Sequence, residues 1–302
     1  MHIPDGFLTP GVSLGMGAAS AATVTWMARR AQGETEESRA PLLGVMGAFV
    51  FAAQMINFPV GVGTTGHLLG GALLAFTLGP ASAIVVMTAI LAIQALVFQD
   101  GGVLALGANV FNMAVAGVLA GYLPYHFLGR GKARGIAIFL GGALSVITSA
   151  SLALAELWFS GVRMPGAILG ISLALFTVAA ALEGLITLGV MRAVETMNPG
   201  WIRKPPGLRR PALAVLTVAA VLLAVVGVFF ASAAPDGLER LAENLGISSR
   251  ARTLFSTPLS GYETRFFVSP WLRKATAGAA GLVLAYVTVL WLGRIASSRK
   301  EN

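Results

Sequence analysis

Long apolar segments separated by short basic loops are the feature that most constrains how this chain can fold. Of its 302 residues, 56% are hydrophobic and only 11% are charged, whereas about a quarter of the residues in a soluble domain are charged. Because lipid offers no hydrogen-bond partners to a backbone, such segments cross a membrane as helices. The sequence therefore predicts an all-α polytopic integral membrane protein.

Nine segments approach the roughly 20 apolar residues that a membrane span needs. The third segment is short, and Gly79-Pro80 separates it from the fourth, so we expect a hairpin or a broken pair there. The segments expected to span are 8–28, 42–58, 66–79, 81–98, 103–127, 134–160, 166–193, 211–233 and 275–295.

Lys and Arg are concentrated in alternate loops, which orients the chain in a cell (inner) membrane by the positive-inside rule. The loops after the first, fifth and seventh segments carry them, as does the carboxyl-terminal tail, whereas the other short loops carry only Arg163. We expect the carboxyl terminus in the cytoplasm, and the amino terminus and the segment 234–274 outside. This topology explains the net charge of +8, so membrane lipid is an expected partner and nucleic acid is not.

A stretch rich in proline, glycine and charge at 194–210 has the composition of a cytoplasmic linker. We therefore expect a seven-helix module over 1–200 and a two-helix module over 211–302. The second module contains a motif expected to be extracellular, in which Asp236 and Glu239 fit a capping box. That pattern alone favours an ordinary capped surface helix. The motif is Pro235, Asp236, Gly237, Leu238 and Glu239.

The chain begins Met1-His2. A cleaved signal peptide is not expected, because it would carry Lys or Arg before its apolar run, and residues 1–28 contain neither. His2 is either an ordinary surface residue or part of a chelate formed by the terminal amine, its own amide nitrogen and its ring. Nitrogen donors in one plane suit Ni(II) or Cu(II), with Co(II) as a relative, and not Mg or Ca. The absence of cysteine excludes thiolate sites.

Such a chelate needs a fourth in-plane donor, and His67 is the other histidine expected on the outer side, because His126 falls near the cytoplasmic end of its segment. The glycine-rich loop 61–66 before His67 lacks the lysine of a phosphate loop. Its glycines are expected to let the backbone pass close to the amino-terminal segment. The metal ligands are thus predicted to be Met1, His2 and His67.

Further polar residues gather at about the same depth near the outer ends of the segments. They either orient the ligands and line the cavity, or join helices through hydrogen bonds. They are Asp5, Gln54, Asn57, Thr64, Thr65, Gln94, Asn109 and Asn112.

Two features indicate contacts with other helices or subunits. Gly11, Gly15 and Ala19 form a stripe of small residues that permits close packing, either within the chain or against another subunit. Glu183 is expected to contact a partner subunit or a neighbouring helix, and the role of Glu156 stays open.

The opening Met1-His2-Ile3-Pro4-Asp5-Gly6, with His67 after a glycine-rich loop and seven expected spans, resembles the CbiM/NikM family. These are substrate-binding components of energy-coupling-factor (ECF) transporters for cobalt and nickel. Residues 211–302 resemble the CbiN/NikN-type accessory component that some members carry fused. The resemblance implies Ni(II) or Co(II) as transported substrate, no organic cofactor, and the same three ligand residues.

The resemblance also implies that energy comes from a coupling transmembrane subunit and two cytoplasmic ATPase subunits, and the chain itself has no Walker motif. We expect a nickel transporter component rather than an enzyme, with a cobalt-specific importer serving cobalamin synthesis as the alternative. A membrane-embedded metalloenzyme would need an activating residue and an open metal position, and the chain lacks H-E-x-x-H. A metal-independent channel or receptor is the remaining class.

Overall fold

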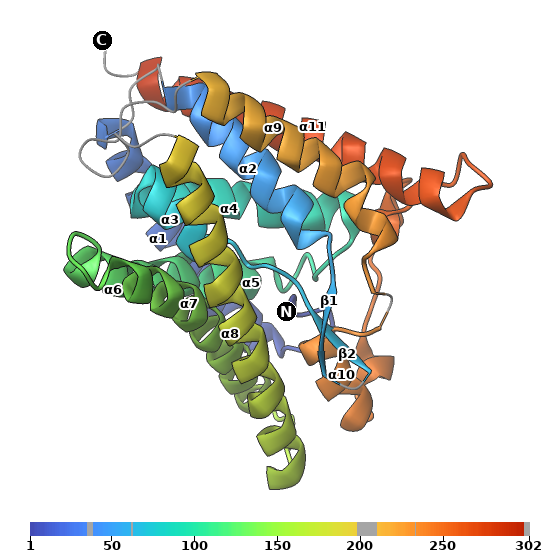
Figure 1. Cartoon of the computed structure of the whole chain (residues 1–302). Coiled ribbons are helices and arrows are strands. Elements are labelled where there is room, and N and C mark those ends of the chain that lie inside the picture. The colour runs from blue at the N-terminus through green and yellow to red at the C-terminus, as the bar shows by residue number, and fades with distance from the viewer. Residues whose placement is uncertain (35–38, 62, 198–209, 233, 299–302) are drawn as a thin grey trace.

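The computed structural model describes residues 1–34, 39–61, 63–197, 210–232 and 234–298. The fold is almost entirely helical, as expected, with one small β-hairpin (Figure 1). The helices, including two π-helical segments, are α1 (Pro10–Glu34), α2 (Ala40–Gln54), α3 (Gly71–Leu78), α4 (Pro80–Ile93), η2 (Gln94–Phe98), α5 (Leu106–Asn109), η3 (Val110–Ala116), α6 (Gly117–Leu128), α7 (Arg134–Phe159), α8 (Gly166–Met197), α9 (Arg210–Val225), α10 (Gly237–Asn244) and α11 (Pro270–Ser298). Single 3-10 turns occupy Gly227–Phe229, Ser248–Arg250 and Ser260–Tyr262.

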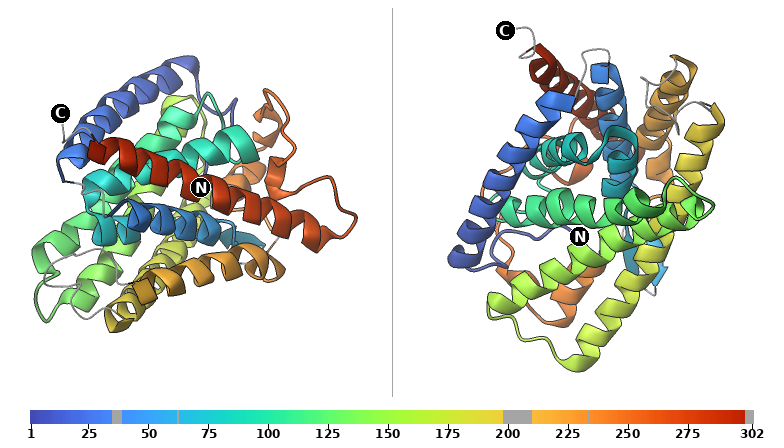
Figure 2. Two further views of the ribbon diagram at one scale, coloured as in Figure 1. Left: turned by 90° about the horizontal axis from the view of Figure 1, so that it is seen from above. Right: turned by 90° about the vertical axis from the view of Figure 1, so that its left-hand side faces the viewer.

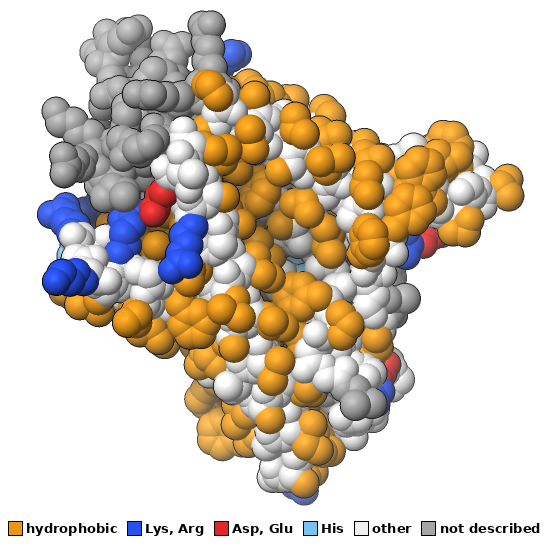
Figure 3. All heavy atoms as spheres, in the orientation of Figure 1, with side chains coloured by type: hydrophobic (Ala, Val, Ile, Leu, Met, Phe, Trp, Pro, Cys, Tyr) orange, Lys and Arg blue, Asp and Glu red, His pale blue; other side chains and the backbone are white. Residues whose placement is uncertain are grey.

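Six stretches of helix within the described residues are long and apolar enough to cross a membrane. They correspond to six of the nine expected spans and are Pro80–Phe98, Leu106–Leu128, Arg134–Phe159, Gly166–Met197, Pro211–Phe229 and Pro270–Ile295. Hydrophobic side chains cover much of the face that α8 and α9 present, as a lipid-facing surface requires (Figure 3). The chain is a multi-pass membrane protein.

The helices formed by the first three segments are not among these six stretches. Helix α1 has the length of a span, but it is rich in Gly, Ala, Ser and Thr, which lowers its hydropathy. Helix α2 has 15 residues and α3 only eight. All eight residues of α3 are buried, so this helix is apolar because neighbouring helices enclose it and not because it spans lipid.

The break between the third and fourth segments lies where the sequence places it. Gly79 separates α3 from α4 with φ 84°, in the region that favours glycine, and Pro80 is the first residue of α4. Proline suits the first turn of a helix because its missing N–H would have no partner there. The expected broken pair is confirmed.

Two π-helical segments interrupt the spans at the polar residues noted above. Gln94 begins η2 at the end of α4, and Asn109 and Asn112 lie at or within η3 between α5 and α6. A π segment widens the helix and re-aims side chains, and such segments are frequent at functional sites. The single span expected over 103–127 is therefore a composite helix.

The glycine-rich loop before His67 is a hairpin of strands β1 (Phe58–Gly61) and β2 (Thr64–Gly66), in which Phe58 pairs with Gly66. The loop was expected to pass close to the amino-terminal segment. Its end does lie there, since Gly66 and His67 line one pocket with Met1. Thr65 also forms a parallel bridge with Asp236, and its N–H donates to the Pro235 carbonyl at 2.9 Å. The hairpin therefore carries the second module's motif to His67.

The two modules pack together along their helices. Helices α9 and α11 lie beside α2, while α6, α7 and α8 form a second group, and the amino terminus lies between the groups (Figures 1 and 2). Helix α10 packs against α8. Leu238, Leu241 and Ala242 of α10 share one hydrophobic cluster with Ile3 and Phe7. Most of the expected linker, 198–209, lies outside the described residues.

Candidate metal centre

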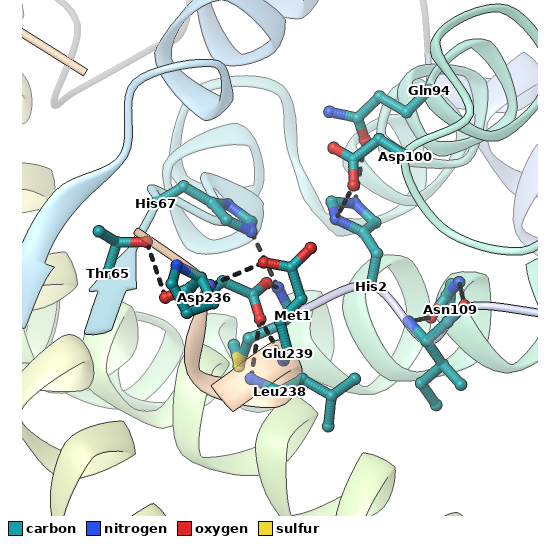
Figure 4. Close-up of polar contacts among 12 residues, drawn as sticks. Met1, His2, Thr65, His67, Gln94, Asp100, Asn109, Asp236, Leu238 and Glu239 are labelled. Atoms are coloured by element: carbon teal, nitrogen blue, oxygen red, sulfur yellow. Dashed lines mark hydrogen bonds and ion pairs between the residues drawn. The ribbon is translucent and has the colours of Figure 1, made fainter. Parts of the chain in front are cut away.

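The amino terminus of the chain is enclosed by the protein. Ile3 is fully buried, and His2 and His67 are only 7% and 9% exposed. The Met1 amine lies 3.0 Å from His67 Nε2, and its other close contact is an ion pair with Asp236 Oδ2 (Figure 4). A buried ammonium group requires such a partner, because removing its charge from water is costly. The structure thus brings Met1 and His67 together.

Backbone hydrogen bonds fix the first residues in register with the loop 100–105. The Ile3 N–H donates to Asn109 Oδ1 at 2.8 Å, and the Ile3 carbonyl accepts from Asn109 Nδ2 at 3.1 Å and from the Gly102 N–H at 2.8 Å. The Asp5 carboxylate accepts from the N–H groups of Val103, Leu104 and Ala105 at 2.7 to 3.1 Å. Asp5 and Asn109 therefore position the segment that carries His2.

The pair Gly101-Gly102 allows this close approach. Gly101 has φ +87°, and a Cβ on Gly102 would lie 2.1 Å from Asp5 Oδ1 and 2.4 Å from the Asp5 nitrogen. Only glycine leaves room for the amino-terminal segment at this point.

His67 presents its Nε2 to the amine because its other ring nitrogen has a partner. Nδ1 lies 3.0 Å from the Leu68 carbonyl, which can only accept, so Nδ1 carries the proton and Nε2 the lone pair. The following turn is held by Glu183, whose carboxylate accepts from the N–H groups of Leu69 and Gly70, both at 2.8 Å.

Of the two expected contacts of Glu183, a partner subunit or a neighbouring helix, the structure has the second, at the turn that leads into α3. It is fully buried within the chain, and both of its oxygens are engaged by the turn after His67. A partner subunit would have no access to this carboxylate. The sequence does not show which helix is the neighbour, because residues 69–70 and Glu183 are more than 110 positions apart.

The His2 ring lies between two acceptors. Nε2 is 3.2 Å from Gln94 Oε1, and Nδ1 is 3.1 Å from Asp100 Oδ1. The Gln94 amide is oriented by a chain of donors, since its Nε2 donates to Gln54 Oε1 at 2.8 Å and Gln54 Nε2 donates to the Leu69 carbonyl at 2.7 Å. This chain turns an oxygen toward His2 Nε2, while Nδ1 faces the Asp100 carboxylate, which can only accept. Nδ1 is the ring nitrogen that can close a small chelate ring with the residue's own amide.

The two histidine rings are stacked, with centroids 5.4 Å apart and planes inclined by 13°. Within the described residues, no group of three or more His, Cys, Asp or Glu side chains could hold a metal ion. A metal at this place would therefore need main-chain nitrogen as well as the two rings, which is the donor set that the Met1-His2 opening supplies.

The surroundings favour a neutral His67 and charged carboxylates at Asp100 and Asp236. Burial lowers the pKa of His67 to about 4, and the nearby positive charge of the amine acts in the same direction. Burial alone would raise the pKa of Asp100 and Asp236. The facing His2 ring lowers that of Asp100, and the amine that of Asp236, so both stay below the ordinary value.

Most of the remaining polar residues that the sequence singled out make hydrogen bonds between elements rather than with the candidate ligands. Thr64 and Thr65 are buried, and Thr65 Oγ1 donates to the Ala234 carbonyl at 2.9 Å. The Asn57 carbonyl accepts from the Ser232 N–H at 2.9 Å, so Asn57 joins the hairpin to the second module. Asn112 Nδ2 donates to Glu156 Oε2 at 2.8 Å. These contacts are structural links.

The small-residue stripe lies on the outside of α1. A Cβ at Gly11 or Gly15 would meet nothing within 4 Å, and Ala19 is half-buried, so α1 leaves this face uncovered by the described chain. His126 is exposed at the far end of α6. Neither belongs to the centre.

The sequence did not reveal that Asp100 and Asp236 contact the candidate ligands His2 and Met1. Asp100 pairs with His2, and its Oδ2 accepts from the Tyr262 hydroxyl at 2.7 Å. Asp236 was recognised as a helix cap but not as the partner of the amine. The Gln99-Asp100-Gly101-Gly102 turn is the one signal that could have drawn attention to Asp100.

Fold and site together define a multi-pass membrane protein whose buried amino terminus forms a nitrogen-rich centre. Residues 2–201 match the family model described as the cobalt uptake substrate-specific transmembrane region, CbiM, and residues 210–298 match the PDGLE domain. The chain is 33% identical to the putative fused nickel transport protein NikMN of Archaeoglobus fulgidus, over 98% of this chain and 99% of that one.

Two further similarities agree. The cobalt transport protein CbiM of Streptomyces coelicolor is 33% identical over 66% of this chain and 90% of its own length. A crystal structure described as a truncated transition metal transporter matches with a TM-score of 0.58 and 34% identity, covering 65% of this chain and 99% of that chain. The chain belongs to the CbiM family, with a fused PDGLE domain, and is a nickel or cobalt transport protein.

Proposed function

We propose that the chain is the substrate-binding component of an ATP-driven ECF-type uptake transporter and binds Ni(II), or Co(II), through the Met1 amine, His2 and His67. The observation that carries the proposal is the buried Met1 amine 3.0 Å from the lone-pair nitrogen of His67, with the His2 ring stacked beside it. Four nitrogen donors, namely amine, His2 amide, His2 Nδ1 and His67 Nε2, suit these cations.

Binding requires the amine and the His2 amide to release their protons, while both rings bind as neutral imidazole. Asn109 and Asp5 hold the backbone of the donor segment, and Leu68 and Glu183 hold the His67 turn. Preorganised donors lose little freedom on binding, which supports high affinity.

Nickel is favoured by the full-length similarity to a fused nickel transport protein. Cobalt uptake, as for cobalamin synthesis, is the second candidate, and it is supported by the cobalt transport relatives. A coupling transmembrane subunit and two cytoplasmic ATPases are the proposed partners, with the amino terminus outside and the carboxyl terminus inside. The exposed stripe of Gly11 and Gly15 on α1 is a surface on which such a subunit could pack.

The decisive experiment compares metal content of purified protein bearing a native Met1 and a carboxyl-terminal tag. We expect bound nickel or cobalt in the parent, measured by mass spectrometry, and its loss in His2→Ala, in His67→Ala and in a variant extended by two residues before Met1. His126→Ala is the matched control, because that exposed histidine lies away from the centre. Full metal content in the extended variant would exclude a role for the amine.

A further inference from the structure

Asp236 has two roles at the amino terminus of α10, one for each carboxylate oxygen. Oδ1 accepts from the N–H groups of Leu238 and Glu239 at 2.8 and 2.9 Å, while the Glu239 carboxylate accepts from the Asp236 N–H at 2.9 Å. This reciprocal capping box fixes the side chain. Oδ2 is left pointing at the Met1 amine (Figure 4).

His2 is held in a parallel way from the opposite side. Its Nδ1 faces Asp100 Oδ1, and the other oxygen of Asp100 accepts from the Tyr262 hydroxyl. The Tyr262 ring stacks on Phe98, with centroids 4.7 Å apart and planes inclined by 15°. Tyr262 lies in the PDGLE domain, as Asp236 does, so this domain restrains both amino-terminal residues, one directly and one through Asp100.

Both carboxylates therefore occupy atoms that the proposed function assigns to the metal. We propose that Asp236 and Asp100 hold the amine and His2 Nδ1 in the metal-free protein and are exchanged for the cation as it binds, with Tyr262 positioning Asp100. The inference rests on the proposed ligand set and goes beyond it, because it assigns the loading step to residues that are not ligands in the loaded site.

The cation would reach these groups from an open cavity of about 280 Å³. His2, Asp100, Asp236 and Glu239 line it together with 251–255, in which Arg252 is the basic side chain. Carboxylates at the mouth of a low-dielectric site concentrate a divalent cation and raise its association rate by ~10 to 10³-fold. Because Asp236 stays anchored by its helix cap, it remains near the site after it leaves the amine.

The test of Asp236 is the rate at which metal-free protein takes up Co(II) or Ni(II), followed by stopped-flow absorbance of the metal. Asp236→Asn removes the charge but keeps a good N-cap residue, so α10 should be preserved. We expect loading to slow on the order of tenfold, while the final metal content and the absorption spectrum of the loaded site stay those of the parent. Glu243→Gln is the control, because that acid lies on the exposed face of α10 and pairs with Arg240 at 3.1 Å.

The test of the second contact is Tyr262→Phe, which keeps the stacking on Phe98 and removes only the hydroxyl. We expect slower loading with an unchanged final spectrum, and a smaller effect than for Asp236→Asn because Asp100 itself is still present. Tyr286→Phe on α11 makes the same chemical change beside Gly44, away from the centre.

Other outcomes overturn the proposal. Parent-like or faster loading in Asp236→Asn would mean that the carboxylate does not assist the exchange. An altered spectrum of the loaded protein would mean that Asp236 stays on the metal. Failure of the proposed function looks different, because the parent itself would then take up no metal, or would take it up equally well with an extended amino terminus.

Discussion

Glu183 is the residue whose position changes the interpretation of the site most. Its two oxygens accept from consecutive N–H groups, Leu69 and Gly70, and thereby fix the turn that aims His67. A carboxylate suits this task because it can accept at both oxygens, whereas an amide would turn an N–H₂ group toward one of the two donors.

We therefore expect Glu183→Gln to lower the free energy of unfolding by about 1 to 3 kcal/mol, the cost of leaving a buried donor unsatisfied, and to weaken metal binding. Thermal unfolding of the metal-free protein and equilibrium metal titration measure the two effects. Glu263→Gln is the control, since Glu263 is a third exposed and pairs with Arg273 at 2.8 Å. Unchanged affinity in Glu183→Gln would show that the turn needs no such support.

His67 carries a second prediction, on pH. Burial lowers its pKa from 6.5 to about 4, so between these values the unfolded chain binds a proton that the folded chain does not. Stability then falls as pH decreases from about 6.5 toward 4, by on the order of 3 kcal/mol for this group. In metal-free protein, thermal unfolding of His67→Gln should lack this part of the decline. The same slope in parent and variant would assign the acid sensitivity elsewhere.

At the scale of elements, the amino-terminal segment and the loop 100–105 form one unit. The segment is held by Asn109 and by the three N–H groups that bind Asp5, and Gly102 allows the contact. The unit depends on backbone proximity, so added bulk should disturb it more than a change of charge on the surface.

Gly102→Ala should accordingly displace the first residues, because its Cβ would lie 2.1 Å from Asp5 Oδ1. We expect at least a tenfold loss of metal affinity, equivalent to about 1.4 kcal/mol, as measured by titration with Ni(II). Gly131→Ala is the matched control, because a Cβ there would meet nothing within 4 Å. Equal affinity of the two variants would contradict the anchoring role.

Much of this arrangement follows from local sequence. Hydrophobic length predicts the spans from α4 onward, Gly79-Pro80 predicts the break before α4, and Asp236 with Glu239 predicts the capped α10, because each signal acts within a few residues. The β-hairpin was missed since its strands have only four and three residues. The ligand set follows from the chelating chemistry of a histidine at position two, and its role in binding stays a prediction.

The contacts that could not be predicted are those made between distant parts of the chain. Asp100 and Tyr262 are 162 positions apart, and Met1 and Asp236 are 235 apart. Nothing in the local pattern of either partner encodes such a pairing. Buried carboxylates in a membrane protein indicate a partner, but the identity of the partner follows only from the packing of helices.

At the scale of the whole molecule, the fused arrangement explains why the two modules form one site. The first module contains the proposed nitrogen donors, and the second contributes Asp236 and Tyr262 from the segment between α9 and α11. Helices α9 and α11 pack beside α2, which leads into the hairpin before His67. The helices of the second module thus place the segment between them beside the amino terminus.

This arrangement makes sense for uptake only if the amino terminus faces outward, which the charge of the loops predicts. The chain contains no cysteine, so single cysteines report topology without background. We expect Ser249→Cys, exposed after α10, to react with a membrane-impermeant maleimide on intact cells. Lys132→Cys, exposed between α6 and α7, should react only after the membrane is permeabilised. The opposite labelling pattern would place the centre on the cytoplasmic side, where it would serve release rather than capture of the metal.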